Sequence, residues 1–163
     1  MLGSHETGRE FLVRSCGILV HGDSVLTQEG EDDRRGRVYA LPGGHLEFGE
    51  TLATGMAREF YEESGLNVEP EKLVYVHENF YALKAVVTHE IGFYFLVDLN
   101  AAFPTPDADG YIPCREPHIR LRLLPLAELK RFPLQPAFLL EQLPIDARDH
   151  FAHPTRHLIS RED

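Results

Sequence analysis

The sequence predicts a layered sandwich of sheets and helices, of the α/β or α+β class. Several segments rich in β-branched and aromatic residues alternate along the chain with one strong helical pattern and two weaker ones. Strands and helices mixed in this way bury their apolar faces against one another in layers. A chain of 163 residues has the usual length of one domain. We therefore expect a single domain over residues 1–163, with a polar tail from about Pro144.

The first third of the chain reads as strands and loops. Residues 11–20 (FLVRSCGILV) and 25–30 (VLTQEG) are two predicted strands around the turn HGDS. The charged, glycine-bounded segment EGEDDRRGR is expected to be a solvated, mobile loop rather than a phosphate clamp, and its arginines are Arg34, Arg35 and Arg37. After it, VYALPGGHLEFGE predicts extended segments interrupted by Pro42 and the two glycines that follow.

The segment TLATGMAREFYEES predicts the main helix. Leu52, Met56 and Phe60 recur at i, i+4 and i+8, which places them on one apolar face. Gly65 follows as a natural stop, since glycine readily adopts the left-handed conformation that ends helices.

The remaining chain alternates strands with short helices. KLVYVHENFYAL and THEIGFYFLVDL predict a strand pair, and the proline-rich residues 100–117 predict a loop. HIRLRLLPL alternates apolar and polar residues, as a half-buried strand does. LAELKRF and PAFLLEQL predict two short helices, and a last strand is expected at RHLIS.

The charge balance argues against nucleic acid as a main partner. The formal net charge is −10, from 16 basic and 26 acidic residues, whereas proteins that bind phosphate backbones carry a basic stripe. If the substrate is an anion, something other than net charge must neutralise it. A divalent cation would do so.

Cysteine usage and hydropathy indicate a soluble, cytoplasmic protein without a membrane partner. Cys16 and Cys114 lie far apart and outside any C-x-x-C pattern, so they predict neither a zinc site nor a disulfide framework. The start MLGSHETGRE lacks a basic and then apolar leader pattern. The apolar runs are far shorter than a membrane span.

Three carboxylates crowd one side of the predicted helix. Glu59, Glu62 and Glu63 are neighbours at helical spacing, where like charges repel by a few tenths of a kcal/mol, roughly, per pair. One interpretation is a solvated acidic face. However, the cluster follows a Pro-Gly-Gly loop, in which backbone carbonyls can approach a ligand. Hard oxygen ligands without Cys or His suit Mg²⁺, Mn²⁺ or Ca²⁺, which would turn the repulsion into coordination.

The spacing around these carboxylates resembles a known family motif. The residues that carry the resemblance are Gly44, Glu50, Arg58-Glu59-Phe60, Glu62-Glu63 and Gly65-Leu66. Their pattern resembles the Nudix box, G-x5-E-x7-R-E-U-x-E-E-x-G-U, where U is a bulky apolar residue. Phe60 occupies a place that is more often aliphatic. The order of strands and helices also resembles the α/β/α sandwich of that family, with a mixed sheet and a loop–helix–loop metal site.

The resemblance implies roles for the residues of the box. Glu59, Glu62 and Glu63 would be ligands or orienters of the metal, and the carbonyl of Gly43 a further ligand. The cofactor would be Mg²⁺, with Mn²⁺ as the alternative. Arg58 would pair with Glu50 and hold the helix to the loop.

The general base stays open among several carboxylates. In the family the base is a glutamate of the box or a glutamate on a later loop, so Glu59 competes with Glu116. Glu63 is included among the catalytic residues. Glu90 is a third candidate for the base, although an edge-strand pair His89-Glu90 facing water is the favoured interpretation.

The resemblance implies hydrolysis of a pyrophosphate bond in a small-molecule nucleotide, by a monomer or homodimer. A nucleoside triphosphate or modified nucleotide is the preferred substrate, and ADP-ribose or another nucleotide sugar is the alternative. A non-catalytic ligand sensor of the same fold is the hypothesis from another class, and it is disfavoured because the box glutamates are present. An isomerase is disfavoured because the box is regular. At most one or two aromatic residues are expected to touch the ligand, from the set Phe48, Phe80, Tyr81, Phe93, Tyr94 and Phe95.

Overall fold

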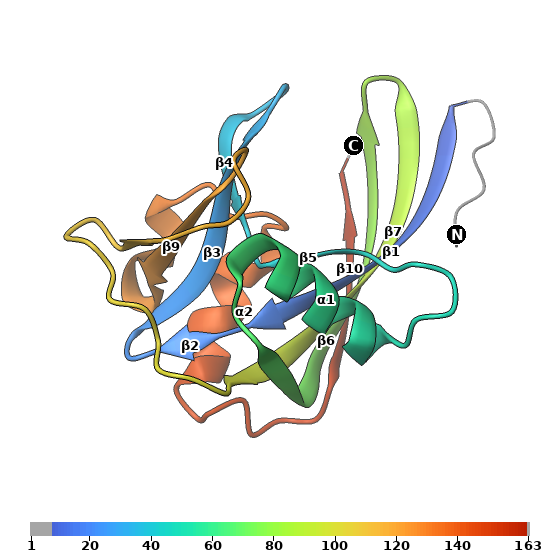
Figure 1. Cartoon of the computed structure of the whole chain (residues 1–163). Coiled ribbons are helices and arrows are strands. Elements are labelled where there is room, and N and C mark those ends of the chain that lie inside the picture. The colour runs from blue at the N-terminus through green and yellow to red at the C-terminus, as the bar shows by residue number, and fades with distance from the viewer. Residues whose placement is uncertain (1–7, 163) are drawn as a thin grey trace.

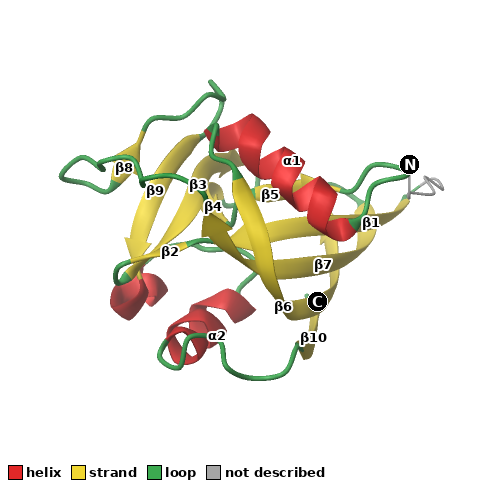
Figure 2. Ribbon diagram, turned by 60° about the horizontal axis from the view of Figure 1, so that its bottom comes forward, coloured by secondary structure: helices red, strands yellow, loops and turns green. Residues whose placement is uncertain are grey.

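The computed structural model describes residues 8–162, which form two β-sheets with helices on their outer sides (Figures 1 and 2). In spatial order, the first sheet contains β10 (Arg156–Arg161), β6 (Val68–Leu83), β7 (Val86–Leu99), β1 (Arg9–Ile18) and β5 (Gly43–His45). Its pairs β10–β6 and β1–β7 are parallel, while β6–β7 and β1–β5 are antiparallel. This mixed sheet confirms the predicted α/β sandwich.

The second sheet is antiparallel and faces the first across the core. It contains, in spatial order, β2 (Val20–His21), β3 (Ser24–Asp32), β9 (Arg120–Pro125) and β8 (Tyr111–Ile112), with β4 (Gly36–Ala40) also paired to β3. The β3–β4 hairpin and the β6–β7 hairpin rise on either side of the molecule in Figure 1, one from each sheet. The space between the two sheets is therefore bounded by these two hairpins.

The helices cover opposite sides of the sheets. In Figure 2, α1 (Leu52–Ser64) lies above the sheets and α2 (Phe138–Ala147) lies below them. The predicted short helix LAELKRF is a 3-10 helix, η1 (Leu126–Arg131). No helix among residues 8–162 is long and apolar enough to cross a membrane.

The sequence explains where α1 begins, ends and packs. The side chain of Thr51 accepts a hydrogen bond from the Thr54 amide and caps the first turn. Gly65 ends the helix at φ 74°, in the left-handed region. Met56 and Phe60 are buried, as the apolar periodicity predicted. Gly17 on β1 makes room for them, because a Cβ there would lie 2.8 Å from the Phe60 ring.

The segment after residue 143 is more structured than a polar tail would be. The helix predicted at PAFLLEQL continues to Ala147, and Phe151 beyond it is 3% exposed. Asp146 at the end of α2 is buried and accepts a hydrogen bond from the hydroxyl of Tyr75 at 2.6 Å. The strand predicted at RHLIS is present as β10, which adds a parallel edge to β6.

Two loop predictions need correction. The segment EGEDDRRGR is the tip of the β3–β4 hairpin, with strand pairing from Gln28 to Asp32, rather than a mobile loop. The glycine at 36 has φ +76°, which lets the chain reverse tightly enough for charged strands to pair. Within residues 100–117, the short strand β8 pairs with β9.

Candidate functional site

The middle of α1 is tied to the loop before it by an arginine–glutamate pair. Arg58 Nε donates to Glu50 Oε2 at 2.7 Å, and its Nη2 donates to Oε1 at 2.9 Å. The hydrogen bond from Arg58 holds the pKa of Glu50 below its usual value. The expected ion pair is thus present, and it fixes the loop containing Glu47, whose amide also donates to Glu50.

Glu63 is the carboxylate in the most unusual environment. Its pKa is raised to about 7, chiefly by burial and then by the nearby charge of Glu59, with a smaller contribution from Glu116, while Arg14 and the Gly43 amide act in the opposite direction. The Gly43 amide lies 3.3 Å from Glu63 Oε2. A carboxylate with this pKa is half protonated near neutral pH, which suits either proton transfer or cation binding.

Two glycines bring the backbone close to the carboxylates. A Cβ on Gly44 would lie 2.4 Å from the carboxyl carbon of Glu59, so this carboxylate occupies the place of a side chain. A Cβ on Gly43 would lie 2.4 Å from the carbonyl oxygen of Ser15. The Pro-Gly-Gly sequence therefore allows β5 to pack directly against β1 and α1.

Glu62 lies apart from the other two carboxylates of the predicted cluster. Its side chain is 57% exposed and accepts a hydrogen bond from Arg58 Nη1 at 3.2 Å. The same nitrogen also lies 3.1 Å from Glu59 Oε1. Within residues 8–162, no group of three or more His, Cys, Asp or Glu side chains is arranged to hold a metal ion. Arg58 bridges Glu59 and Glu62 and neutralises part of the repulsion between them.

The remaining carboxylates still fit a divalent cation. Glu59 lies close enough for its charge to raise the pKa of Glu63, and Glu63 is half-buried. Half-buried, mutually repelling carboxylates offer hard oxygen ligands, which suit a cation such as Mg²⁺ or Mn²⁺.

The loop containing Glu116 is attached to the C-terminal end of α1. The amide of Arg115 and the thiol of Cys114 both donate to the carbonyl oxygen of Glu63, each at 3.3 Å. The charge of Glu116 is near enough to raise the pKa of Glu63. The structure therefore places this loop beside the end of α1, while the role of Glu116 as a base stays a prediction.

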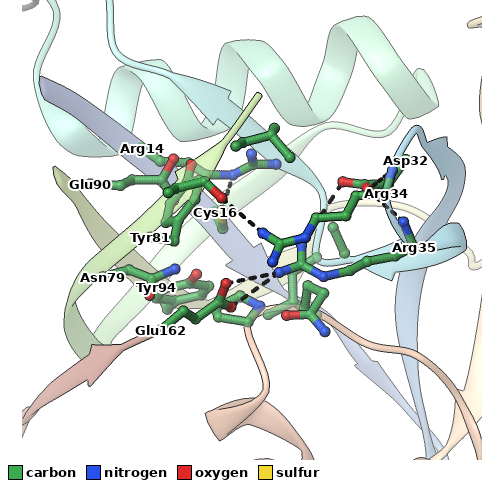
Figure 3. Close-up of a pocket in the computed structure, with 16 residues that line it drawn as sticks. Arg14, Cys16, Asp32, Arg34, Arg35, Asn79, Tyr81, Glu90, Tyr94 and Glu162 are labelled. Carbon is green, nitrogen blue, oxygen red and sulfur yellow. Dashed lines mark hydrogen bonds and ion pairs between the residues drawn. The ribbon is translucent and has the colours of Figure 1, made fainter. Parts of the chain in front are cut away.

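A cavity of about 180 Å³ lies between the two sheets, and none of the residues that line it belongs to the box (Figure 3). Its walls include Arg14 and Cys16 from β1, Asn79 and Tyr81 from β6, and Glu90 and Tyr94 from β7. Two of the six aromatic residues considered from the sequence, Tyr81 and Tyr94, therefore line it.

His89 and Glu90 do not form an edge-strand pair facing water. The strand β7 lies inside the first sheet, between β6 and β1, and successive residues point to opposite faces. Glu90 lines the cavity with its side chain 12% exposed. His89 stacks on Phe80 at a ring-centroid distance of 4.2 Å. The favoured interpretation was wrong because periodicity gives the alternation but not the place of the strand in the sheet.

Two polar residues of the site, Arg14 and Gln28, were not predicted from the sequence. Arg14 is half-buried in the cavity wall, donates to Cys16 Sγ at 3.3 Å, and lowers the pKa of Glu63, which burial raises. The amide group of Gln28 on β3 lies 2.8 Å from Glu63 Oε2 and donates to it when its NH₂ faces the carboxylate. Both belong to predicted strands, where an inward polar residue in an alternating pattern gives no signal of its own.

A model of the NUDIX domain matches residues 12–143 of the chain. The chain belongs to the Nudix hydrolase family. The match covers the box and the second sheet, but not β10 of the first sheet or Glu162 of the cavity wall. The family therefore accounts for the strands from β2 to β9 and for α1.

Curated relatives include the phosphatase NudJ of Escherichia coli K12. It is 29% identical over 100 residues, which are 61% of this chain and 62% of NudJ, so the match spans less than two thirds of that relative. Among solved structures, a NUDIX hydrolase of Nitrosomonas europaea has a TM-score of 0.64 and 21% identity, over 93% of this chain and 79% of that one. The MutT protein of Bacillus halodurans has a TM-score of 0.63 and 19% identity, over 92% and 88%. These structures show the shared fold.

Proposed function

We propose that this Nudix protein is a Mg²⁺-dependent hydrolase that cleaves a pyrophosphate bond in a nucleoside diphosphate linked to another moiety. A nucleoside triphosphate or modified nucleotide is the preferred substrate. The observation that carries the proposal is the position of Arg14. Its side chain donates to Cys16 in the cavity wall, and its charge lowers the pKa of Glu63 in the box. This position of Arg14 supports treating the cavity and the carboxylates as two parts of one site.

The cavity supports a neutral polar moiety rather than a second phosphate group. Its charged lining residues balance, three arginines against three carboxylates: Arg14, Arg34, Arg35, Asp32, Glu90 and Glu162. Arg35 is paired with Glu162 at 3.1 Å, so its charge is already neutralised. A nucleoside is neutral and carries donors and acceptors, whereas the phosphates attached to it would extend toward the carboxylates of the box.

The carboxylates supply the chemistry of the proposal. When bound, Mg²⁺ neutralises the pyrophosphate and increases the acidity of water. Glu59 and Glu63 would hold it, with the Gly43 carbonyl as the further ligand expected from the sequence and Glu62 as an outer carboxylate. Arg58 and Glu50 keep the loop and α1 in register, as their two hydrogen bonds indicate.

Hydrolysis needs a base for the attacking water. A carboxylate takes one proton from the water, the water oxygen forms a bond to one phosphorus, and the bond from that phosphorus to the bridging oxygen breaks. The second phosphate leaves with the bridging oxygen and its electron pair. Glu59, Glu63 and Glu116 are the carboxylates near one another at this position, and all three are candidates for the base.

The test is turnover across a panel of nucleotides. Release of phosphate, pyrophosphate and nucleoside monophosphate is measured for nucleoside triphosphates, modified nucleotides, ADP-ribose and other nucleotide sugars, with Mg²⁺, with Mn²⁺ and with EDTA. We expect metal-dependent cleavage of triphosphates or modified nucleotides, abolished by EDTA. Cleavage confined to nucleotide sugars would select the alternative substrate class. Binding of nucleotides without turnover of any of them would refute the hydrolase and favour a ligand sensor.

A further inference from the structure

The tip of the β3–β4 hairpin reaches across the cavity from the second sheet to the first. Arg35 Nη2 lies 3.1 Å from both carboxylate oxygens of Glu162, directly after β10. Arg34 Nη1 donates to the carbonyl oxygen of Ala82 on β6 at 2.8 Å. Figure 3 shows both arginines extending from the hairpin toward the first sheet. Residues 32–35, here called the strap, thus join two sheets whose hairpins otherwise rise apart.

The conformation of the strap is set within the strap itself. Asp32 Oδ1 accepts hydrogen bonds from the amides of Arg34 and Arg35, at 2.8 and 2.9 Å. These bonds form a tight turn that fixes the direction of both arginine side chains. Asp33 in the same turn pairs with Lys84 at the tip of the β6–β7 hairpin. The strap is therefore a preformed turn held to the first sheet by side-chain contacts.

The cavity behind the strap is small for a nucleotide site. Its volume of about 180 Å³ lies below the range of roughly 300–1,000 Å³ that is usual for ligand pockets. Asp32, Arg34, Arg35 and Glu162 all line it, so the strap and its partner are part of its wall. Moving the strap away from the first sheet would enlarge the cavity without disturbing the buried core.

We propose that the strap is a self-inhibiting closure of the substrate cavity, held by the ion pair between Arg35 and Glu162, and that it must open before a nucleoside moiety enters. The proposal rests on the proposed function of the site. Arg35 and Glu162 are positioning residues in it, since they stand apart from the box carboxylates. The closed state competes with substrate, so the apparent affinity is reduced by the fraction of molecules that are closed.

The contacts that hold the strap are suited to repeated opening. The side chains of Arg35 and Glu162 are 33% and 39% exposed, so water and salt screen their attraction. Exposed ion pairs of this kind change an equilibrium by about two- to fivefold. We therefore expect removal of the pair to raise the open population by this factor.

Cys16 provides a native probe of opening that needs no ligand. It lies in the cavity wall and is 1% exposed, so its modification reports access to the cavity. The experiment measures the rate at which iodoacetamide modifies Cys16 in the full-length chain, in a Cys114→Ser background. We expect Arg35→Ala and Glu162→Ala each to raise this rate about two- to fivefold, and the double variant to raise it no further.

Two further variants control the experiment. The charge-reversed double variant Arg35→Glu/Glu162→Arg should return the rate toward that of the parent. Arg131→Ala, which removes an exposed ion pair with Glu128 in η1, should leave it unchanged. Urea denaturation of each variant gives the global stability in parallel. Unchanged rates in the strap variants, or increases that match their loss of global stability, would overturn the closure.

The second readout is the Kd of a non-hydrolysable analogue of ATP. Opening of the strap predicts that Arg35→Ala and Glu162→Ala lower this Kd by the same factor by which they accelerate Cys16 modification. A raised Kd would overturn the self-inhibiting role. The two proposals fail separately: faster Cys16 modification with no nucleotide turnover in the panel would keep the strap and refute the hydrolase, whereas turnover with unchanged Cys16 reactivity would do the reverse.

Discussion

Arg58 and Glu50 form a two-bonded ion pair that joins the middle of α1 to the loop in front of it. The Nε–Oε2 and Nη2–Oε1 distances are 2.7 and 2.9 Å, and Glu50 also accepts from the Glu47 amide at 2.9 Å. Planar guanidinium and carboxylate groups in this geometry hold direction as well as distance. The pair therefore couples the stability of the loop to the position of the carboxylates on α1.

Replacement of Arg58 by Ala should lower both stability and activity. Glu50 is 13% exposed and would be left without its main partner, which costs about 1–3 kcal/mol of unfolding free energy. Arg58→Lys should recover part of the loss, because lysine keeps the charge but lacks the fork. Thermal denaturation measures both variants, with Arg131→Ala as the control for an exposed pair. Equal melting temperatures for Arg58→Ala and the parent would reject the pairing.

Replacement of Glu63 by Gln should abolish most turnover while the protein stays folded. The amide keeps the shape of the buried carboxylate but can neither bind a cation strongly nor take a proton. We expect kcat to fall at least about 10²–10⁴-fold, the usual contribution of a positioned acid–base group. Steady-state kinetics and circular dichroism check the two parts. A folded variant with the parent rate would remove Glu63 from the site.

Glu63 should also make the metal-free protein less stable as the pH rises. Its pKa is about 7 in the folded state, above the ordinary value of 4.5, so the folded chain retains a proton that the unfolded chain has lost. Stability from this group is therefore complete below pH 4.5 and is lost as the pH rises to about 7, by up to about 3 kcal/mol. Urea denaturation in EDTA at several pH values measures the slope. Glu63→Gln should flatten it, and a slope of the same size in that variant would assign it to other groups.

The two glycines before the loop should respond differently to an added methyl group. In Gly44→Ala the new Cβ meets the end of the Glu59 side chain, which can turn aside. We expect lost activity with a melting temperature close to the parent. In Gly43→Ala the Cβ meets backbone atoms of Ser15 and Cys16, which cannot move without shifting β1. That variant should be clearly less stable, and the reverse ranking of melting temperatures would contradict the packing described for β5.

Protonation of His77 should lower the free energy of unfolding as the pH falls. Burial lowers its pKa to about 4, below the ordinary value of 6.5, and its Nε2 lies 2.8 Å from the hydroxyl of Ser160 on β10. Between pH 6.5 and about 4, His77 is therefore protonated in the unfolded chain but neutral in the folded chain. The contribution is fully present above pH 6.5 and is lost progressively as the pH falls toward 4. Melting temperatures of the parent and of His77→Gln should converge over that range, and parallel curves would refute the assignment.

The elements that the sequence predicted are those encoded by a local pattern of residues. The apolar spacing of Met56 and Phe60 and the stop at Gly65 gave α1 because helical periodicity is local. The pairing of Arg58 with Glu50 was implied by the resemblance of the box to the family motif, not by periodicity. The β3–β4 hairpin was missed because strand pairing between charged residues leaves no apolar alternation. Arg14 and Gln28 were missed because their proximity to Glu63 depends on two sheets meeting, which no local pattern encodes.

Glu63 contacts a residue from each sheet, so its pKa depends on how the two sheets are placed relative to each other. Gln28 reaches it from β3 in the second sheet, and Gly43 reaches it from β5 in the first. A movement of the sheets away from each other would lengthen the contact with Gln28 or the contact with Gly43. The carboxylate of Glu63 would then have fewer hydrogen-bond donors. The distance between the two sheets should therefore influence the pKa of Glu63, and a ligand that changes this distance should change that pKa.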